Sequence, residues 1–327
     1  MKSKDKGMKR IIISAALLCF LVFLSVAQDL KRAGIAKPVG FDYSPDTLSI
    51  LSWNVEHFVD EFDNPYTNNN RENDPAQQMG NKEELLVKAL KKADADIVVL
   101  QEFESSEYLR AMVEKYFPEA GYQFYAGNES DGWYMNVVIM SKVPLGTFYS
   151  YGSLYTPVPG IFDEDGNEET QININTRMWS IDVLPKADYD FNLTGVHLKA
   201  GRGERNEQMR IGQINFLKNQ FQRFLKEDKK ANLVIMGDFN AYPDSKEMKT
   251  VLDGKKGNEF IDPLDVSILS HPSREPARRL DYMIPNSNMY KELVKGSMKI
   301  EYWLTKEEMI TLSDHLPVYA EFVMQDK

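Results

Sequence analysis

Two polar clusters in this chain of 327 residues each adjoin an apolar run. The four apolar residues 233–236 lead through a glycine into Asp238 and Asn240. The order is reversed in the second cluster, because Asp314 and His315 precede the apolar run. Carboxylate, carboxamide and imidazole groups at strand ends can hold a hard divalent cation and polarise a phosphate. The two clusters therefore indicate metal-dependent phosphoester chemistry.

Four further residues, Asn54, Glu102, His197 and Asp281, also stand at the end of an apolar run. Each has another explanation when it is taken alone. Asn54 suits a turn, Glu102 suits the cap of a following helix, and His197 suits a hydrogen-bonded core position. Asp281 suits an ion pair with one of the two preceding arginines. Because the chain has only four histidines, so many coincidences together favour one functional site.

Apolar periodicity predicts the elements that would position these residues. Helices are expected from the N-cap Asn81 through Ala93, opened by a capping box, and at 106–117 and 204–225, while residues 60–80 read as a long surface loop. The Asp-Gly pair in the acidic segment 163–169 is typical of a hairpin turn. Strands interleaved with helices predict a layered α/β fold with both faces of the sheets covered. The strands are expected at 47–55, 96–103, 137–141, 177–184, 191–199, 232–237, 280–284 and 316–324.

Residues 1–27 have the pattern of a secretory signal peptide. Five basic residues and one acid occupy the first ten positions, an apolar run covers 11–24, and Ser25-Val26-Ala27 follows. The apolar run is shorter than the roughly 20 residues of a membrane-spanning helix. We therefore expect cleavage, export to the periplasm or the exterior, no stable membrane insertion afterwards, and an irregular lead-in at 28–46.

The remaining composition excludes several classes of function. The single cysteine, Cys19, lies within the apolar run of the signal, so the mature chain offers neither a disulfide nor a thiol nucleophile. Removing five basic residues and one acid changes the net charge from -10 to -14. This acidity argues against a broad basic platform for nucleic acid. It leaves nuclease activity open, because bound cations neutralise a site locally.

In their order along the chain, these motifs resemble the endonuclease/exonuclease/phosphatase superfamily of deoxyribonuclease I-like enzymes. The resemblance spans roughly residues 47–325 and implies a single domain over 47–327, after the signal at 1–27 and the lead-in at 28–46. It implies a four-layer sandwich, with two mixed β-sheets packed face to face and helices outside. The motifs that carry it are Ser-Trp-Asn-Val-Glu at 52–56, Leu-Gln-Glu at 100–102, Gly-Val-His-Leu at 195–198, Gly-Asp-Phe-Asn at 237–240, Leu-Asp-Tyr at 280–282 and Ser-Asp-His-Leu-Pro-Val at 313–318.

The resemblance also implies a role for each matching residue. Glu102 is the chief metal ligand, helped by Asn54 and Asp314. Asp238 and Asn240 orient the attacking water and the phosphate oxygens. His315 is a general acid/base or phosphate contact oriented by Asp281, and His197 contacts the scissile phosphate. Either Asp238 or a histidine takes the proton of the water.

The chemistry of the residues indicates the cofactor, while the substrate stays open. Mg²⁺ (or Mn²⁺) is expected, since it is held by one or two carboxylates plus waters and substrate oxygens. The basic residues Lys199, Arg202 and Arg205 follow His197 and are candidates for binding a polyanion, although a solvated turn would look the same. Asn136, before the strand at 137–141, is a further candidate for binding substrate.

These observations leave three hypotheses. The first is an exported, divalent-metal-dependent phosphodiesterase, an endonuclease acting on DNA or RNA. The second is a phosphomonoesterase or phospholipid diesterase, inositol phosphatase-like or sphingomyelinase-like, on the same fold. The third is a binding module without activity, against which the intact set of candidate residues speaks. The sequence indicates no particular protein partner.

Overall fold

Two large mixed sheets face each other in the computed structural model, which describes residues 43–129 and 132–327. These residues belong to one compact unit, Gly40–Lys327. The first sheet has the strand order β12-β13-β1-β2-β4-β3, in which β1 and β2 are parallel. Its strands are β1 (Thr47–Phe58), β2 (Ile97–Phe103), β3 (Phe124–Gly127), β4 (Asn136–Ser141), β12 (Lys299–Ile300) and β13 (Val318–Val323).

The second sheet has the order β11-β10-β9-β8-β5, in which β9 and β10 are parallel. A separate two-stranded hairpin consists of β6 (Thr156–Phe162) and β7 (Glu168–Gln171). The strands of the second sheet are β5 (Leu145–Ser150), β8 (Met178–Lys186), β9 (Tyr189–His197), β10 (Leu233–Asp238) and β11 (Asp281–Pro285).

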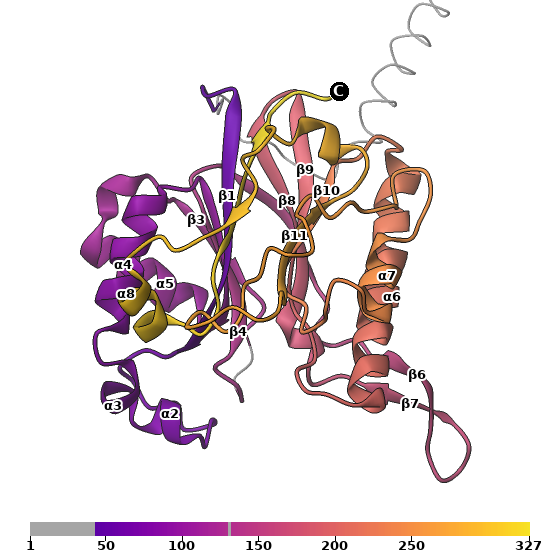
Figure 1. Cartoon of the computed structure of the whole chain (residues 1–327), viewed down its shortest axis with the longest axis horizontal. Coiled ribbons are helices and arrows are strands. Elements are labelled where there is room, and N and C mark those ends of the chain that lie inside the picture. Colours follow the sequence, from indigo (N-terminus) through magenta and orange to yellow (C-terminus); the bar gives the residue numbers. More distant parts are fainter. Residues whose placement is uncertain (1–42, 130–131) are drawn as a thin grey trace, which may run out of the picture. The chain divides into compact units, whose positions relative to one another are not determined.

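Helices cover the outer face of each sheet (Figure 1). Helices α4 (Lys82–Ala93), α5 (Ser106–Tyr116) and α8 (Lys306–Leu312) pack on the first sheet. Helices α6 (Glu204–Glu227) and α7 (Lys246–Leu252) pack on the second. The predicted four-layer sandwich is confirmed. The shorter helices are α2 (Asn70–Asn73), α3 (Pro75–Met79), η1 (Pro118–Ala120), η2 (Asn175–Arg177) and η3 (Met289–Glu292).

Strands with apolar residues on both faces contribute side chains to two cores, one between the sheets and one beneath the helices. In β1, Ile50 points into the core between the sheets, and the next residue, Leu51, points into the core beneath the helices. Trp179 joins the sheets directly, because its indole N–H donates to the carbonyl of Val137 at 2.8 Å. Gly195 makes room for this ring, since a Cβ there would lie 2.8 Å from it. The sandwich therefore has three apolar layers, which hold the strand ends in place.

The sequence predictions differ from the structure mainly in half-buried segments. The predicted loop at 60–80 contains the short helices α2 and α3, because Asn69 caps the first and a proline begins the second. Strands β3, β5 and β12 were not expected, since their residues are only partly buried and show little alternation. Helix α4 starts at Lys82 as predicted, but the side chain of Asn81 makes no capping hydrogen bond.

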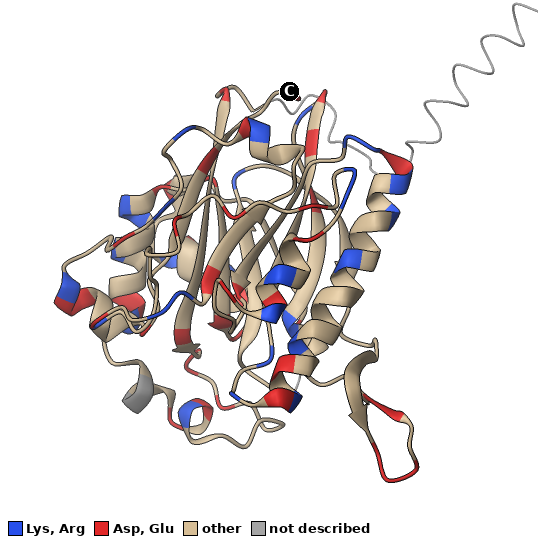
Figure 2. Ribbon diagram, turned by 45° about the vertical axis from the view of Figure 1, so that its right-hand side comes forward, with Lys and Arg blue, Asp and Glu red and all other residues tan. Residues whose placement is uncertain are grey.

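The predicted acidic turn is confirmed as the tip of the β6–β7 hairpin. Asp163 accepts hydrogen bonds from the main-chain N–H groups of Asp165 and Asn167, and Figure 2 shows the acidic tip projecting from the body. The predicted signal and nearly all of the lead-in lie outside the described residues. None of the helices within 43–129 and 132–327 has the length and apolar character that a membrane crossing requires.

Candidate functional site

Strand register brings the predicted residues to one rim of the sandwich. In the second sheet, Asp238 at the end of β10 pairs with His197 at the end of β9 on one side and with Asp281 at the start of β11 on the other. In the first sheet, Asn54 in β1 pairs with the residue just before Glu102 in β2. The loop before β13 carries Asp314 and His315 to the same rim.

The β10 strand reaches this rim because it carries a glycine. Gly237 has φ 133°, and a Cβ there would lie 1.9 Å from the carbonyl oxygen of Val196 in β9. Any side chain would push the two parallel strands apart. The glycine of the Gly-Asp-Phe-Asn motif is thus required for the register that pairs Asp238 with His197.

Strained backbone directs the carboxylate of Glu102 to the rim. The register of β2 against β4 shifts between Gln101 and Phe103, so Glu102 occupies a bulge, with φ 59°. Glu56, His57 and Asn240 also have φ near 50°, a region that costs non-glycine residues energy. A bulge that re-aims one side chain, surrounded by strained neighbours, is typical of a functional site.

Glu102, Asn54 and Asp238 form the centre of the site. The Asn54 carboxamide donates to Glu102 Oε1 at 3.2 Å and to Asp238 Oδ2 at 3.1 Å. Its own oxygen accepts the main-chain N–H of Glu56 at 3.0 Å. Asn54 therefore joins two carboxylates across the two sheets, and its oxygen would face a metal only after the amide turns over.

Glu102 remains ionised despite its burial. Burial raises the pKa of its carboxyl, but the surrounding groups, including the Asn54 amide that donates to it, lower the pKa below its usual value overall. The main-chain N–H of His57 also donates to Glu102 Oε2 at 3.1 Å. A charged, pre-positioned carboxylate is the form that binds a divalent cation.

His197 is fully enclosed between the acids. Its Nε2 lies 3.8 Å from Glu102 Oε1 and 3.6 Å from Asp238 Oδ2, and its buried Nδ1 has no hydrogen-bond partner among the described residues. Burial, together with the nearby charge of Arg177, lowers the pKa of His197 to about 3. The ring is therefore neutral, and it can act on a phosphate as an N–H donor.

His315 has the opposite electrostatic environment. Burial opposes its charge, but the carboxylates, above all Asp281, whose Oδ2 lies 2.8 Å from its Nδ1, raise the pKa of His315 to about 10. Asp281 is itself held by the Ser270 hydroxyl at 2.6 Å. His315 Nε2 faces Asp238 Oδ2 at 3.9 Å, and burial raises the pKa of Asp238 to about 7. The site thus holds a proton-bearing imidazole beside a carboxylate.

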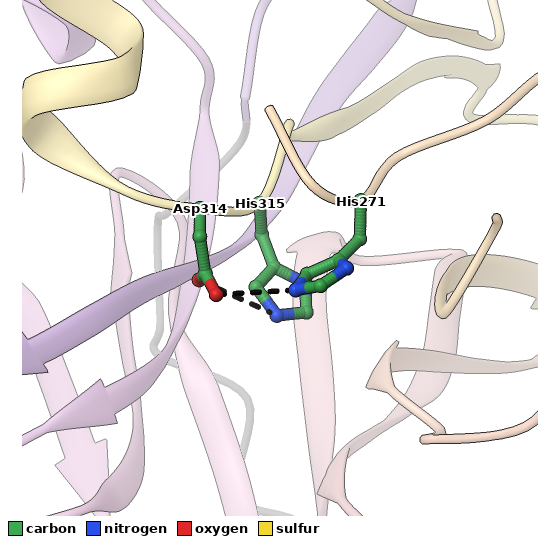
Figure 3. Close-up of side chains that lie close together, drawn as sticks. All are labelled: His271, Asp314 and His315. Carbon is green, nitrogen blue, oxygen red and sulfur yellow. Dashed lines mark hydrogen bonds and ion pairs between the residues drawn. The ribbon is translucent and has the colours of Figure 1, made fainter. Parts of the chain in front are cut away.

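Asp314 lies beside two imidazoles, as Figure 3 shows. Its Oδ2 contacts Nε2 of His271 at 3.1 Å, and its Oδ1 lies 3.7 Å from Nε2 of His315. Arg278 donates to Nδ1 of His271, so the proton of a neutral His271 sits on Nε2 and points at Asp314. Although burial raises the pKa of Asp314, the hydrogen bond from His271 helps to lower it overall.

Sequence reasoning missed Glu56, two histidines and Arg177 of this site. All four histidines of the chain gather here, including His57, whose Nδ1 contacts the Tyr134 hydroxyl at 2.9 Å, and His271. Arg177, which precedes β8, lies with its guanidinium carbon 5.4 Å from the centre of the Trp133 ring. Histidine is rare in this chain, and this rarity was the signal that could have marked His57 and His271 as candidates. Arg177 was expected as the first residue of the strand at 177–184, and it lies in the short helix η2, where no local pattern marks it as a site residue.

The four predicted substrate-binding residues differ in their exposure and in their hydrogen-bond partners. Arg205 is paired with Glu169 of the hairpin, and the ammonium of Lys199 donates to a neighbouring carbonyl. Arg202 is exposed and lines a hollow of about 590 Å³ that reaches Asn240. Asn136 is buried and donates to two main-chain carbonyls, so it holds the loop that carries Trp133. Among these four residues, Arg202 is the one free to meet substrate beside the rim.

The donor set fits a hard divalent cation. Besides Glu102, the rim carries the carboxylates of Glu56, Asp238, Asp281 and Asp314, and oxygen donors of this kind suit Mg²⁺ or Mn²⁺. One buried oxygen of Asp281 has no hydrogen-bond partner among the described residues. Of the three predicted metal ligands, Asn54 and Glu102 are in contact, whereas Asp314 contacts Glu56 and the histidines.

Comparison with known proteins decides the family. The model of the Endonuclease/Exonuclease/phosphatase family matches residues 51–315. The chain belongs to this family. It is therefore a divalent-metal-dependent hydrolase of phosphoric esters, as the resemblance predicted. A search of curated proteins found no match.

Solved structures of the family share the fold. D. rerio TDP2, complexed with single-strand DNA product, has a TM-score of 0.57 at 17% identity over 85% of this chain and 99% of its own. The human Nocturnin catalytic domain with bound sulfate has a TM-score of 0.52 at 16% identity over 87% and 97%. An endonuclease/exonuclease/phosphatase from Bacteroides vulgatus has 0.56 at 14% over 86% and 100%.

The His315–Asp281 pair generates a first prediction. In Asp281→Asn the imidazole loses its charged partner, so kcat for bis-p-nitrophenyl phosphate should fall about 10- to 100-fold with KM nearly unchanged. Steady-state kinetics and the melting temperature check this. Asp265→Asn, an exposed aspartate upstream of the same strand, is the control and should retain full activity. A kcat for Asp281→Asn within twofold of the wild type would contradict the positioning role.

Proposed function

We propose that this enzyme is an exported, Mg²⁺- or Mn²⁺-dependent phosphodiesterase that cleaves DNA or RNA as an endonuclease. The observation that carries the proposal is the pair of Arg177 and Trp133 beside the acids of the rim. Burial lowers the pKa of Arg177, while its attraction to Glu102, Tyr134 and Asp238 works in the other direction. Its Nε is buried without a hydrogen-bond partner, and among the described residues no carboxylate pairs with it.

The side chain of Arg177 is partly buried and its buried Nε lacks a hydrogen-bond partner, so the guanidinium fits a phosphate that arrives with the substrate. Trp133 is partly exposed beside it and offers a face on which a base can stack. A phosphate contact next to a stacking surface matches a nucleotide better than an isolated phosphate group. The D. rerio TDP2 structure, which contains a single-strand DNA product, supports nucleic acid as the substrate class.

The residues of the rim can divide the reaction among them. Glu102 would hold the metal, with Asn54 and Asp314 nearby, and the bound metal supplies Lewis-acid stabilisation of the phosphate. Asp238 and Asn240 position the attacking water, since the Asn240 N–H holds Asp238 at 2.8 Å. His197 donates its N–H to the scissile phosphate. His315, oriented by Asp281, carries the proton that the leaving oxygen needs.

One observation favours the alternative of a phospholipid diesterase. A hollow of about 250 Å³ beside the rim is lined by Asp60, Asp63, Glu104 and Glu129 together with Phe62, Trp133 and Tyr134. Carboxylates and aromatic faces together can receive a cationic headgroup. In a phospholipid, such a group would lie next to the phosphodiester. This hollow makes a choline or ethanolamine lipid the second candidate substrate.

A substrate panel tests the proposal. With Mg²⁺, the purified enzyme should cleave single- or double-stranded DNA or RNA and bis-p-nitrophenyl phosphate, and EDTA should abolish both activities. Asp238→Asn, which removes one carboxylate at the centre, should lower kcat at least about 10²-fold. Release of phosphocholine from sphingomyelin without cleavage of nucleic acid would move the assignment to the lipid. Full activity after exhaustive EDTA dialysis would exclude the metal mechanism.

Export rests on the sequence pattern of residues 1–27 and is part of the same proposal. If this segment is a cleaved signal, the mature protein should begin near Gln28 and lie outside the cytoplasm. Intact-mass measurement of the protein from its native host checks this expectation. Retention of Met1 in a soluble cytoplasmic pool would contradict it.

A further inference from the structure

A second charged surface lies on the outer side of α6 and α7, toward the end of β10 away from the catalytic rim. It is a groove of about 1680 Å³ between the last turns of α6, the loop after α7 and the segment after β11. Figure 2 shows lysines and arginines along both helices. We call this surface the lysine groove. Its lining includes the lysines Lys218, Lys226, Lys229, Lys249, Lys255, Lys256 and Lys291.

The lysine groove is a local reversal of the charge of the chain. Seven lysines and two acids, Asp253 and Glu259, line it, a formal charge of +5 in a chain of net charge -10. Six of the lysines are exposed, and none of the six forms an ion pair within the described residues. Unpaired like charges held together repel one another, so this arrangement fits an anionic partner.

Internal hydrogen bonds build the groove. The seventh lysine, Lys218, is partly buried and donates to the carbonyls of Val251, Asp253 and Asn258, which ties α6 to the loop after α7. The carboxamide of Asn288 donates to the carbonyl of Lys229 at 3.2 Å, which ties the turn after α6 to the segment after β11. The exposed ammonium groups therefore project from a braced concave wall.

The groove continues from the catalytic side along α6 and α7. The hollow beside Asn240 is lined by Glu207 and Lys246, and the groove by Lys218 and Lys249. Glu207 and Lys218 are eleven residues apart, about three turns, so they share one face of α6 roughly 16 Å apart. A strand that leaves the catalytic rim through the hollow would meet the lysines next.

We propose that the lysine groove binds the sugar–phosphate backbone of a nucleic-acid strand whose scissile phosphate lies at the catalytic rim. This inference rests on the proposed nucleic-acid substrate. Since the rim itself is rich in carboxylates, cations elsewhere must supply the affinity for a polyanion. A concave groove also suits a strand better than a flat membrane surface. From the rim to the end of α6, about 36 Å, the strand needs roughly ten nucleotides.

Oligonucleotide length and lysine replacement test the proposal. Binding of fluorescein-labelled dT30 and dT5 is measured by anisotropy with Mg²⁺, in an Asp238→Asn background that suppresses cleavage. Replacing Lys229, Lys255 and Lys291 together with Ala should raise the Kd for dT30 about tenfold. It should also reduce the salt slope of binding by about 2, the value for three lost phosphate contacts on a single strand. Binding of dT5 should change less than twofold.

The matched control replaces three exposed lysines of α4 and α8, Lys91, Lys92 and Lys306, with Ala. It removes the same charge from the opposite side of the sandwich, and dT30 binding should change less than twofold because salt screens distant charges. Both triple variants, made without the Asp238 change, should hydrolyse bis-p-nitrophenyl phosphate at the wild-type rate.

Equal weakening of dT30 binding by both triple variants, or none by the groove variant, would overturn the proposal. If the groove variant loses binding to phosphatidylglycerol vesicles but binds dT30 as the wild type does, the groove is a membrane-binding surface and the proposal is wrong. If the wild type binds dT30 through the groove yet cleaves no nucleic acid, the proposed function fails while the groove assignment stands. If the wild type cleaves DNA or RNA but the groove variant is indistinguishable from the control, the function stands and the groove assignment fails.

Discussion

The pairing of Asp238 with His197 and Asp281 at the ends of three adjacent strands is the constraint on which this site depends. It places two carboxylates and an imidazole within one rim, and Gly237 permits the close approach that the register needs. The opposite sheet adds Glu102 through a bulge, and Asn54 joins the two sheets by hydrogen bonds to both acids. The apolar core between the sheets thus holds like charges together that would separate in water.

Residues of the same type have different protonation states in this rim, because their electrostatic environments differ. His197 is neutral because it is buried near Arg177, whereas His315 is charged because Asp281 contacts it directly. Two imidazoles therefore act differently, one as a neutral donor and one as the carrier of a proton. The same logic applies to the acids, since Glu102 remains ionised while burial favours the protonated form of Asp238.

Much of this arrangement could be predicted from the sequence. Polar residues at the ends of apolar runs identify strand ends, and parallel neighbours bring such ends to one rim, so Asn54, Glu102, His197 and Asp238 were found. His57 lies at the end of β1, Arg177 in the short helix η2 and His271 outside the named strands, and the surroundings of each depend on tertiary packing that no local pattern reports. The roles assigned to Arg205 and Asn136 depended on side-chain partners, namely Glu169 and two main-chain carbonyls, that only the structure shows. The lysine groove combines residues from three separate segments of the chain. The composition reports only the net negative charge of the whole chain and cannot show such a local cluster.

We infer that the rim carboxylates around Glu102 hold a divalent metal, and anomalous diffraction from crystals grown with Mn²⁺ can locate that metal. We expect a manganese peak within coordination distance of the Glu102 carboxylate, and we expect this peak to disappear in Glu102→Gln crystals. A peak confined to the cluster of His271, Asp314 and His315, or no peak at the rim at saturating Mn²⁺, would contradict it.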